Sequence, residues 1–263
     1  DSVASRGLGD VYKRQKLHEQ EDPLFLANVW DVISAKAAEA AGFEAIGTSS
    51  HAIANVLGYE DGENMSFYEM LYMIERITKS TNLLVSADIE SGFTKDLNQL
   101  NEYVEKLVDV GVVGINIEDG NTSTDERKLD DVKVLADKIH SIKTYLKAKG
   151  KDLFINARID TYTTEHPRAL DETIVRAKIY KDVGADGIFV PLITTEEDIK
   201  KMVQTIDLPL NTFVTAKSLD YPAQKNLGVK RISSGNAVHA KVTDFTSYFF
   251  KHLNDSKSFY FLF

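Results

Sequence analysis

A short junction recurs four times along the chain and limits the folds available to it. Gly42, Gly111, Gly184 and Gly228 each follow a stretch with helical spacing, and each is followed by a short β-branched or apolar run. Glycine is favoured just past the end of a helix because it enters the left-handed conformation without a steric penalty. This repeated order of helix, glycine and strand predicts βα units whose strands run parallel.

Four further apolar runs bring the number of expected strands to eight. The expected strands are 24–29, 45–49, 83–88, 112–118, 153–158, 187–191, 208–214 and 231–234. Eight parallel strands that alternate with helices over ~250 residues are typical of a (β/α)8 TIM barrel, and we predict this α/β fold as a single domain. A doubly wound sheet is the competing fold. It usually carries G-x-G-x-x-G after its first strand, and neither that motif nor a P-loop occurs here.

The composition excludes several classes of function. The 263 residues carry a formal charge of −9, which argues against an electrostatic grip on nucleic acid or on an anionic membrane. No apolar run approaches the ~20 residues that span a bilayer. Without cysteine, the chain has no disulfide, no thiolate metal site and no cysteine nucleophile. We therefore expect a cytoplasmic protein with neither a nucleic-acid nor a membrane partner.

The first fifteen residues have no hydrophobic periodicity and none of the zones of a signal peptide. Residues 10–15 read Asp-Val-Tyr-Lys-Arg-Gln, which matches the in-frame translation of a transposon end used to prepare sequencing libraries. We therefore expect residues 1–15 to be a non-native, adapter-derived arm, with a natural disordered arm as the alternative. Residues 16–263 are expected to hold the barrel and a C-terminal helical segment.

Polar residues gather at the carboxyl ends of the expected strands. They are Thr48, Ser49, Ser50 and His51 after the second strand, Asp88 and Glu90 after the third, Glu118 and Asp119 after the fourth, Arg158 and Asp160 after the fifth, and Asn211 in the seventh. A barrel brings these strand ends to one face, where active sites are built. Clustered carboxylates repel one another unless a cation lies among them, and oxygen ligands favour Mg²⁺ or Mn²⁺. An arginine beside them offers a planar fork for a carboxylate or phosphonate.

Five segments resemble the isocitrate lyase/phosphoenolpyruvate mutase superfamily: 27–63, SADIESGF at 86–93, GINIEDG at 114–120, INARIDTY at 155–162 and GADGIFVPL at 184–192. The similarity extends from about residue 24 to residue 234. It implies a (β/α)8 barrel that holds Mg²⁺, or alternatively Mn²⁺, and a small carboxylic or phosphonic acid. Members of the family break or rearrange a C–C or P–C bond next to a 2-oxo or 2-hydroxy acid through a pyruvate-type enolate. The resemblance also favours a homodimer or homotetramer.

The resemblance implies roles for individual residues, which can be grouped by function. They are Ser49 with its neighbours Thr48 and Ser50, Arg158 and Asn211 for substrate binding, Asp88 and Glu118 for the metal, and Asp61, Glu118 and Arg158 for catalysis. Trp30 ends the first strand, where it either lines the pocket or packs in the core. For Asp88, Glu118 and Arg158 the alternative is a structural ion-pair network, and for Glu90 it is a helix cap.

Two departures from the family pattern matter. The strand-three motif usually has aspartates at two alternate positions, and here Ser86 takes the first, so Glu90 is expected to supply the missing metal-binding charge. The lyases carry a K-K-C-G-H lid whose cysteine acts as acid or base, whereas the corresponding segment 120–128 is short, polar and free of cysteine. The chain therefore resembles the phosphonomutase-like subgroup, with Asp61 and Glu118 as the candidates for proton transfer.

These observations predict a Mg²⁺-dependent lyase or phosphonomutase-like enzyme that acts on a small 2-oxo or 2-hydroxy acid. The alternatives are an oxaloacetate decarboxylase or phosphonopyruvate hydrolase on the same scaffold, a Schiff-base aldolase that uses Lys217, and a non-catalytic metabolite-binding barrel. The aromatic tail at 248–250 and 259–263 is too apolar to be freely exposed. We expect this tail to pack on the barrel or on a partner subunit.

Overall fold

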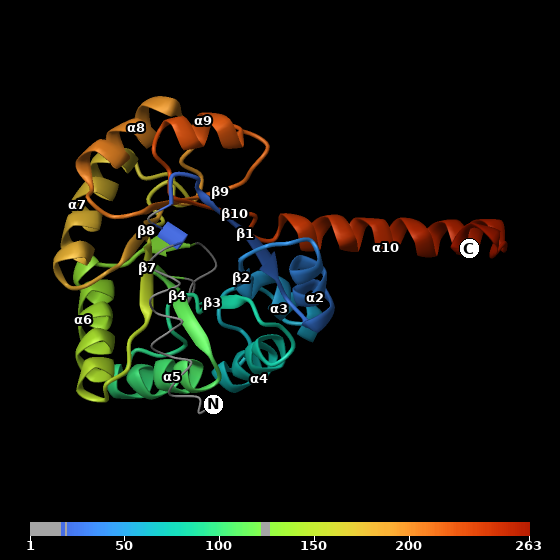
Figure 1. Ribbon diagram of the computed structural model, residues 1–263, viewed down its shortest axis with the longest axis horizontal. Coiled ribbons are helices and arrows are strands. Elements are labelled where there is room, and N and C mark those ends of the chain that lie inside the picture. The colour runs from blue at the N-terminus through green and yellow to red at the C-terminus, as the bar shows by residue number, and fades with distance from the viewer. Residues whose placement is uncertain (1–16, 19, 122–126) are drawn as a thin grey trace.

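The computed structural model describes residues 17–18, 20–121 and 127–263, so the arm expected at 1–15 lies outside the described residues. Eight parallel strands close into a barrel in the order β1-β10-β9-β8-β7-β4-β3-β2 (Figure 1). They are β1 (Leu24–Val29), β2 (Ala45–Thr48), β3 (Leu84–Asp88), β4 (Val112–Glu118), β7 (Phe154–Arg158), β8 (Gly187–Phe189), β9 (Leu210–Phe213) and β10 (Arg231–Ser233). Each strand coincides with one of the expected runs, and the (β/α)8 prediction is confirmed.

Helices connect the strands around the outside of the barrel. They are α2 (Val32–Ala40), α3 (Ser50–Leu57), α4 (Phe67–Thr78), α5 (Leu97–Asp109), α6 (Val132–Ala148), α7 (Ala169–Asp182), α8 (Glu196–Thr205) and α9 (Tyr221–Asn226). The four junction glycines, Gly42, Gly111, Gly184 and Gly228, all have φ between +85° and +108°. This left-handed conformation ends a helix and turns the chain into the next strand.

Side-chain caps fix where several helices begin. Ser66 Oγ accepts a hydrogen bond from Glu69 N at 3.3 Å, and Glu69 Oε2 accepts one from Ser66 N at 2.9 Å, which together form a capping box. Ser49 caps α3 in the same sense, because its Oγ accepts from Ala52 N at 3.3 Å. The Thr48-Ser49-Ser50 segment is therefore both a strand end and a helix start.

The core has an apolar shell and a polar layer in the barrel interior. Side chains such as Ile74, Leu107 and Ile139 are fully buried between the strands and the helices. In the interior layer, Asn156 Nδ2 donates to Asn116 Oδ1 at 2.9 Å and to Asn211 Oδ1 at 3.0 Å. Asn211 Nδ2 also donates to Ser233 Oγ at 3.2 Å, and Arg231 Nη2 donates to Asn116 Oδ1 at 3.3 Å, so this buried network joins several strands and forms the floor beneath the strand ends.

A two-stranded hairpin and two C-terminal helices lie outside the barrel pattern. A two-stranded hairpin of β5 (Gly120–Asn121) and β6 (Lys128–Leu129) follows β4. After β10, α10 (Ala237–Ser256) and a short 3-10 helix, η1 (Tyr260–Leu262), complete the chain. Across the described part of the chain, no helix is both long and apolar enough to cross a membrane.

The helix α10 points away from the barrel rather than packing along it (Figure 1). None of its residues is buried, and Phe245, Tyr248 and Phe250 are each more than 60% exposed. The tail after it includes Phe259, which is also exposed. Of the two covers expected for the aromatic tail, its own barrel is therefore excluded, because the helix points away from the barrel. A partner subunit remains the predicted cover.

Candidate active site

A cavity of about 210 Å³ opens at the carboxyl ends of the barrel strands. Among the described residues, its lining includes seven of the residues that the sequence predicted for the site: Ser49, Ser50, Asp61, Asp88, Glu90, Glu118 and Arg158. It also includes Arg127, to which the sequence analysis gave no role. The polar strand ends therefore meet around one cavity, as the barrel fold requires.

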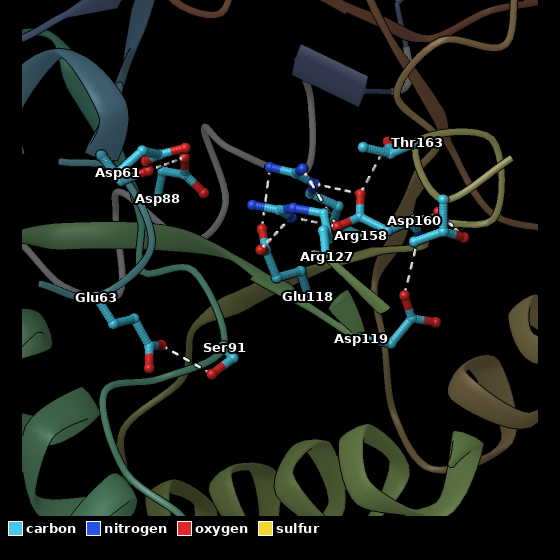
Figure 2. A network of polar contacts seen from close by, with 12 residues as sticks. Asp61, Glu63, Asp88, Ser91, Glu118, Asp119, Arg127, Arg158, Asp160 and Thr163 are labelled. Carbon is cyan, nitrogen blue, oxygen red and sulfur yellow. Dashed lines mark hydrogen bonds and ion pairs between the residues drawn. The ribbon is translucent and has the colours of Figure 1, made fainter. Parts of the chain in front are cut away.

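Two arginines and two carboxylates form a closed ring of alternating charge on one wall of this cavity (Figure 2). Arg158 Nη1 lies 2.9 Å from Glu118 Oε2, and Arg158 Nε donates to Asp160 Oδ1 at 2.8 Å. Arg127 Nη1 donates to Glu118 Oε1 at 2.6 Å and also contacts Asp160 Oδ2. Because each carboxylate touches both guanidinium groups, the ring is held rigid and has no net charge when all four groups are ionised.

The strand register explains why two of these side chains meet. Glu118 and Arg158 are the last residues of β4 and β7, and they are direct partners in the parallel ladder between those strands. Asp160 lies two residues beyond Arg158, where its N–H donates to Asp119 Oδ1 at 2.9 Å. Asp119 is in turn fixed through Oδ2 by Tyr180 OH at 2.9 Å. Buried partners therefore hold the acidic side of the ring from behind.

Arg127 is the site residue that the sequence analysis missed. It directly precedes β6, in a segment that could be described from the sequence only as short and polar. Its partners Glu118 and Asp160 follow two different barrel strands, so no spacing in the sequence connects them to it. The available signal was a positive charge close to the expected acidic strand ends.

The opposite wall carries acidic groups that lack partners. Asp88 is oriented by Thr48 Oγ1, which accepts from Asp88 N at 2.9 Å, and by Ser50 Oγ, which donates to Asp88 Oδ2 at 2.9 Å. Among the described residues, Asp88 Oδ1 and both carboxylate oxygens of Glu90 are buried without a hydrogen-bond partner. Glu90 also has φ of +50°, an uncommon conformation for a residue other than glycine.

A second acidic loop is attached to the segment that contains Glu90. Glu63 Oε1 accepts from Ser91 Oγ at 2.8 Å and from Phe93 N at 2.9 Å (Figure 2). These contacts hold the loop of Asp61 against the loop that follows β3. Asp61 itself contacts His51, with 3.3 Å between Oδ2 and Nδ1.

The acidic groups are shifted toward their protonated forms. Burial raises the pKa of Glu90 to about 9, and the negative charges of Asp61 and Glu118 add to this shift. Burial also raises the pKa of Glu118 to about 8, although Arg158 acts to lower it. The pKa of Asp88 is raised by burial too, against the opposing effect of Arg158. Such shifts are characteristic of functional sites and of sites that receive a cation.

Three residues predicted to bind substrate are not among the described residues that line the cavity. Trp30 instead packs edge-on against His239, with 4.9 Å between the ring centroids, as expected from its packing alternative. Thr48 orients Asp88, and Asn211 belongs to the amide floor beneath the cavity. The structure therefore places these side chains in support of the cavity wall. Lys217 is exposed, which leaves the Schiff-base alternative without its buried lysine.

The chemistry of the donor set suits a hard cation. Within the described parts of the chain, no three carboxylate or histidine side chains already form a closed ligand set. Asp88 and Glu90 nevertheless offer three buried oxygens that have no partner. Mg²⁺ commonly binds to only one or two carboxylates and keeps several waters, so these oxygens fit its requirements.

Several known proteins are similar to this chain in sequence and in fold. The family model described as phosphoenolpyruvate phosphomutase matches residues 14–253. An uncharacterized protein of Mycobacterium tuberculosis is 35% identical over 224 residues, which cover 85% of this chain and 82% of that protein. An oxaloacetate decarboxylase of Pseudomonas entomophila is 29% identical over 221 residues, which cover 81% of this chain and 74% of the relative.

A solved structure, a provisionally assigned phosphonomutase of Burkholderia cenocepacia, is similar with a TM-score of 0.87 and 33% identity. The match covers 92% of this chain and 99% of that one. The matched length and the shared barrel lead to one assignment: the chain belongs to the phosphoenolpyruvate phosphomutase family, within the phosphoenolpyruvate mutase/isocitrate lyase superfamily.

Proposed function

We propose that the protein is a Mg²⁺-dependent lyase that cleaves a bond next to the carbonyl or hydroxyl carbon of a small 2-oxo or 2-hydroxy acid and generates a pyruvate-type enolate. One observation carries this proposal: unpartnered, buried oxygens of Asp88 and Glu90 line the same small cavity as Arg158. A cation site and an anion site across one cavity suit a substrate whose acid group is held while charge develops on a neighbouring oxygen.

Asp88 would be the principal Mg²⁺ ligand, with Glu90 and Glu118 as further oxygen ligands. When bound, the ion would stabilise the negative charge that develops on the enolate oxygen. The start of α3 supplies backbone N–H groups and the Ser49 hydroxyl for the substrate carboxylate, while the Ser50 hydroxyl orients Asp88. Arg158 orients the substrate from the ring of alternating charge.

Glu118 is the residue we assign to proton transfer. Its carboxyl group lines the cavity, and its pKa of about 8 leaves it able to hold or release a proton near neutral pH. Asp61 lines the same cavity and is the second candidate. A phosphoryl group that migrates between carbon and oxygen needs no proton transfer from Glu118 or Asp61. Product analysis therefore distinguishes this mutase chemistry from lyase chemistry.

The reaction can be tested with oxaloacetate, phosphonopyruvate, phosphoenolpyruvate and substituted malates. Pyruvate-type products would be followed by coupled reduction, and conversion between phosphonate and phosphate ester by ³¹P NMR. We expect bond cleavage in at least one substrate with Mg²⁺, and loss of at least 100-fold of the rate with EDTA or in Asp88→Asn. Glu102→Gln, which removes an exposed carboxylate on α5, is the matched control and should retain the rate.

Three outcomes would contradict the proposal. Equal rates with Mg²⁺ and with EDTA would show that the reaction does not require a metal ion. Interconversion of phosphonopyruvate and phosphoenolpyruvate without free pyruvate would assign a mutase instead. Binding of these acids without any turnover would assign the non-catalytic barrel.

The exposed aromatic face of α10 supports a homo-oligomer in which this helix packs on a second copy of the chain. Monomeric soluble proteins rarely expose a contiguous apolar surface of this kind. Phe245, Tyr248 and Phe249 are in ring contact with one another, and Phe245 and Tyr248 are each 62% exposed, so a second copy is expected to cover this face.

A further inference from the structure

The two arginines of the charged ring use their guanidinium nitrogens differently. Arg158 is engaged by protein carboxylates at all three nitrogens: Nε and Nη2 donate to Asp160 at 2.8 and 3.3 Å, and Nη1 lies 2.9 Å from Glu118. Arg127 contacts Glu118 and Asp160 through a single nitrogen, Nη1, and within the described parts of the chain its Nε and Nη2 have no hydrogen-bond partner.

The unused edge of Arg127 has a defined chemical preference. Nε and Nη2 form the side-on fork of a guanidinium group, and Arg158 uses this same fork to hold the carboxylate of Asp160. Such a fork binds carboxylate or phosphonate oxygens in pairs, which a lysine cannot do. Arg127 lines the 210 Å³ cavity, and 21% of its side chain is exposed. The fork therefore belongs to a residue that an anion in the cavity can reach.

We propose, on the basis of the function proposed above, that Arg127 binds a second acid group of the substrate and makes the site selective for diacids. The first acid group is held at the start of α3, and the second, a carboxylate or a phosphonate, occupies the Nε/Nη2 fork of Arg127. Arg127 is thus a specificity-determining residue that acts beside Arg158.

The charge balance of the ring supports this role. Glu118 and Asp160 at most balance the charges of Arg127 and Arg158, so the ring carries no net negative charge and does not repel an incoming anion. The opposite wall carries Asp61 and Asp88, whose ionised forms do repel it. A diacid can place one acid group at the ring and the other at the start of α3, whereas a single acid group cannot occupy both places.

Binding measurements on unreactive acids test the proposal separately from turnover. Calorimetric titrations with lactate, malate and 3-phosphonolactate compare one acid group, two carboxylates, and a carboxylate with a phosphonate. We expect the wild type to bind at least one diacid about 10- to 100-fold more tightly than lactate, the range for a bidentate charged contact. In Arg127→Gln this preference should fall to threefold or less, with the affinity for lactate changed less than threefold.

Two further variants make the result interpretable. Arg127→Lys keeps the charge without the fork and should also lose most of the diacid preference while keeping a wild-type melting temperature. Lys128→Gln removes the neighbouring exposed charge of the same hairpin and should behave as wild type. Whether malate or 3-phosphonolactate gains more identifies the second acid group.

A retained diacid preference in Arg127→Gln would overturn the proposal. Equal weakening of lactate and diacids in both Arg127 variants would also overturn it, because Arg127 would then act only through Glu118 and Asp160. These outcomes are independent of the proposed reaction, which is tested by turnover and by its dependence on metal. A wild type that shows no turnover, but a diacid preference that depends on Arg127, would contradict the proposed function and leave the role of Arg127 standing.

Discussion

Arg158 is one of the two cations of the charged ring, and its planar shape matters as much as its charge. It contacts Asp160 through two nitrogens and Glu118 through the third. A lysine at this position supplies one charged point that cannot hold both carboxylates in a plane. The ring, and with it the orientation of Glu118, depends on the guanidinium group.

We therefore expect Arg158→Lys to lower kcat/KM by at least about 100-fold, equivalent to about 2.7 kcal/mol of barrier. The variant should still fold, because the charge that compensates Glu118 and Asp160 is kept. Steady-state kinetics with a melting curve provide the measurement. Near-normal kcat/KM would assign Arg158 to the structural ion-pair alternative.

The raised pKa of Glu90 makes the stability of the folded protein depend on pH. Its pKa is raised from an ordinary 4.5 to about 9, so between these values the folded protein binds a proton that the unfolded chain has released. The free energy of unfolding of the metal-free protein should therefore fall as pH rises, by up to about 1.4 kcal/mol per pH unit from this group.

Glu90→Gln removes this titration. In EDTA, urea unfolding between pH 5 and pH 9 should show the variant gaining stability relative to wild type as pH rises. Glu102→Gln, which changes an exposed carboxylate, should follow the wild-type curve. Parallel curves for wild type and Glu90→Gln would show that Glu90 is ionised in the folded protein at neutral pH.

The sequence predicted the site residues at the ends of barrel strands but missed Arg127, which does not lie at a strand end of the barrel. Asp88, Glu118 and Arg158 were accessible because parallel strands bring their carboxyl ends to one face. Arg127 enters from a hairpin, and its position depends on side-chain contacts with Glu118 and Asp160 that have no sequence periodicity. Asp160 was recognised at a strand end without a role, because ring closure needs the position of Arg127.

The β5–β6 hairpin packs closely against the charged ring at Gly120. A side chain at Gly120 would collide with Asp160 Oδ2 and come within 3.0 Å of Arg127 Nη1. Only the absence of a Cβ lets the hairpin approach the charged ring. The strand after β4 therefore needs glycine for close packing rather than for a turn.

Gly120→Ala should disturb the ring and lower kcat/KM by about tenfold or more. Gly42→Ala is the matched control, because its Cβ would have open space and its cost is backbone strain at φ +85° alone. That control should lose about 1 kcal/mol of stability with normal kcat/KM. Normal kinetics in Gly120→Ala would contradict the close packing of hairpin and ring.

The elements themselves were the most predictable part of the molecule. Apolar runs and junction glycines located all eight barrel strands, since helix ends need left-handed residues and buried parallel strands need continuous apolar character. The hairpin was missed because two-residue strands such as β6 carry no periodic pattern.

For the whole molecule, α10 is the feature that an isolated barrel does not explain. It extends away from the barrel with no buried residue (Figure 1). Sequence composition predicted that the aromatic tail needs a cover but could not decide between the barrel and a second copy. The hydrophobic effect favours burial of these aromatic side chains, but because it is non-directional it does not determine which surface covers them.

Sedimentation tests the partner that we propose for α10. Wild type should sediment as a dimer or larger species, and Phe245→Ser/Tyr248→Ser/Phe250→Ser should sediment nearer the 29.4 kDa monomer. Lys241→Ser/Asp244→Ser changes an exposed ion pair on the same helix without changing net charge, and it should remain oligomeric. A monomeric wild type would contradict a covered aromatic face.

The proposed chemistry depends on a divalent cation bound to Asp88. Thermal melts with EDTA and with Mg²⁺ test this binding most directly. In EDTA, Asp88→Asn should melt at or slightly above the wild-type temperature, because it removes a buried acidic group with a raised pKa. At about 100 times the dissociation constant, Mg²⁺ should stabilise the wild type by about 2.7 kcal/mol, a shift of several degrees. Asp88→Asn should gain much less, Glu90→Gln should fall between them, and Glu102→Gln should match wild type. An equal Mg²⁺-induced shift in wild type and Asp88→Asn would remove Asp88 from the metal site and contradict the proposed chemistry.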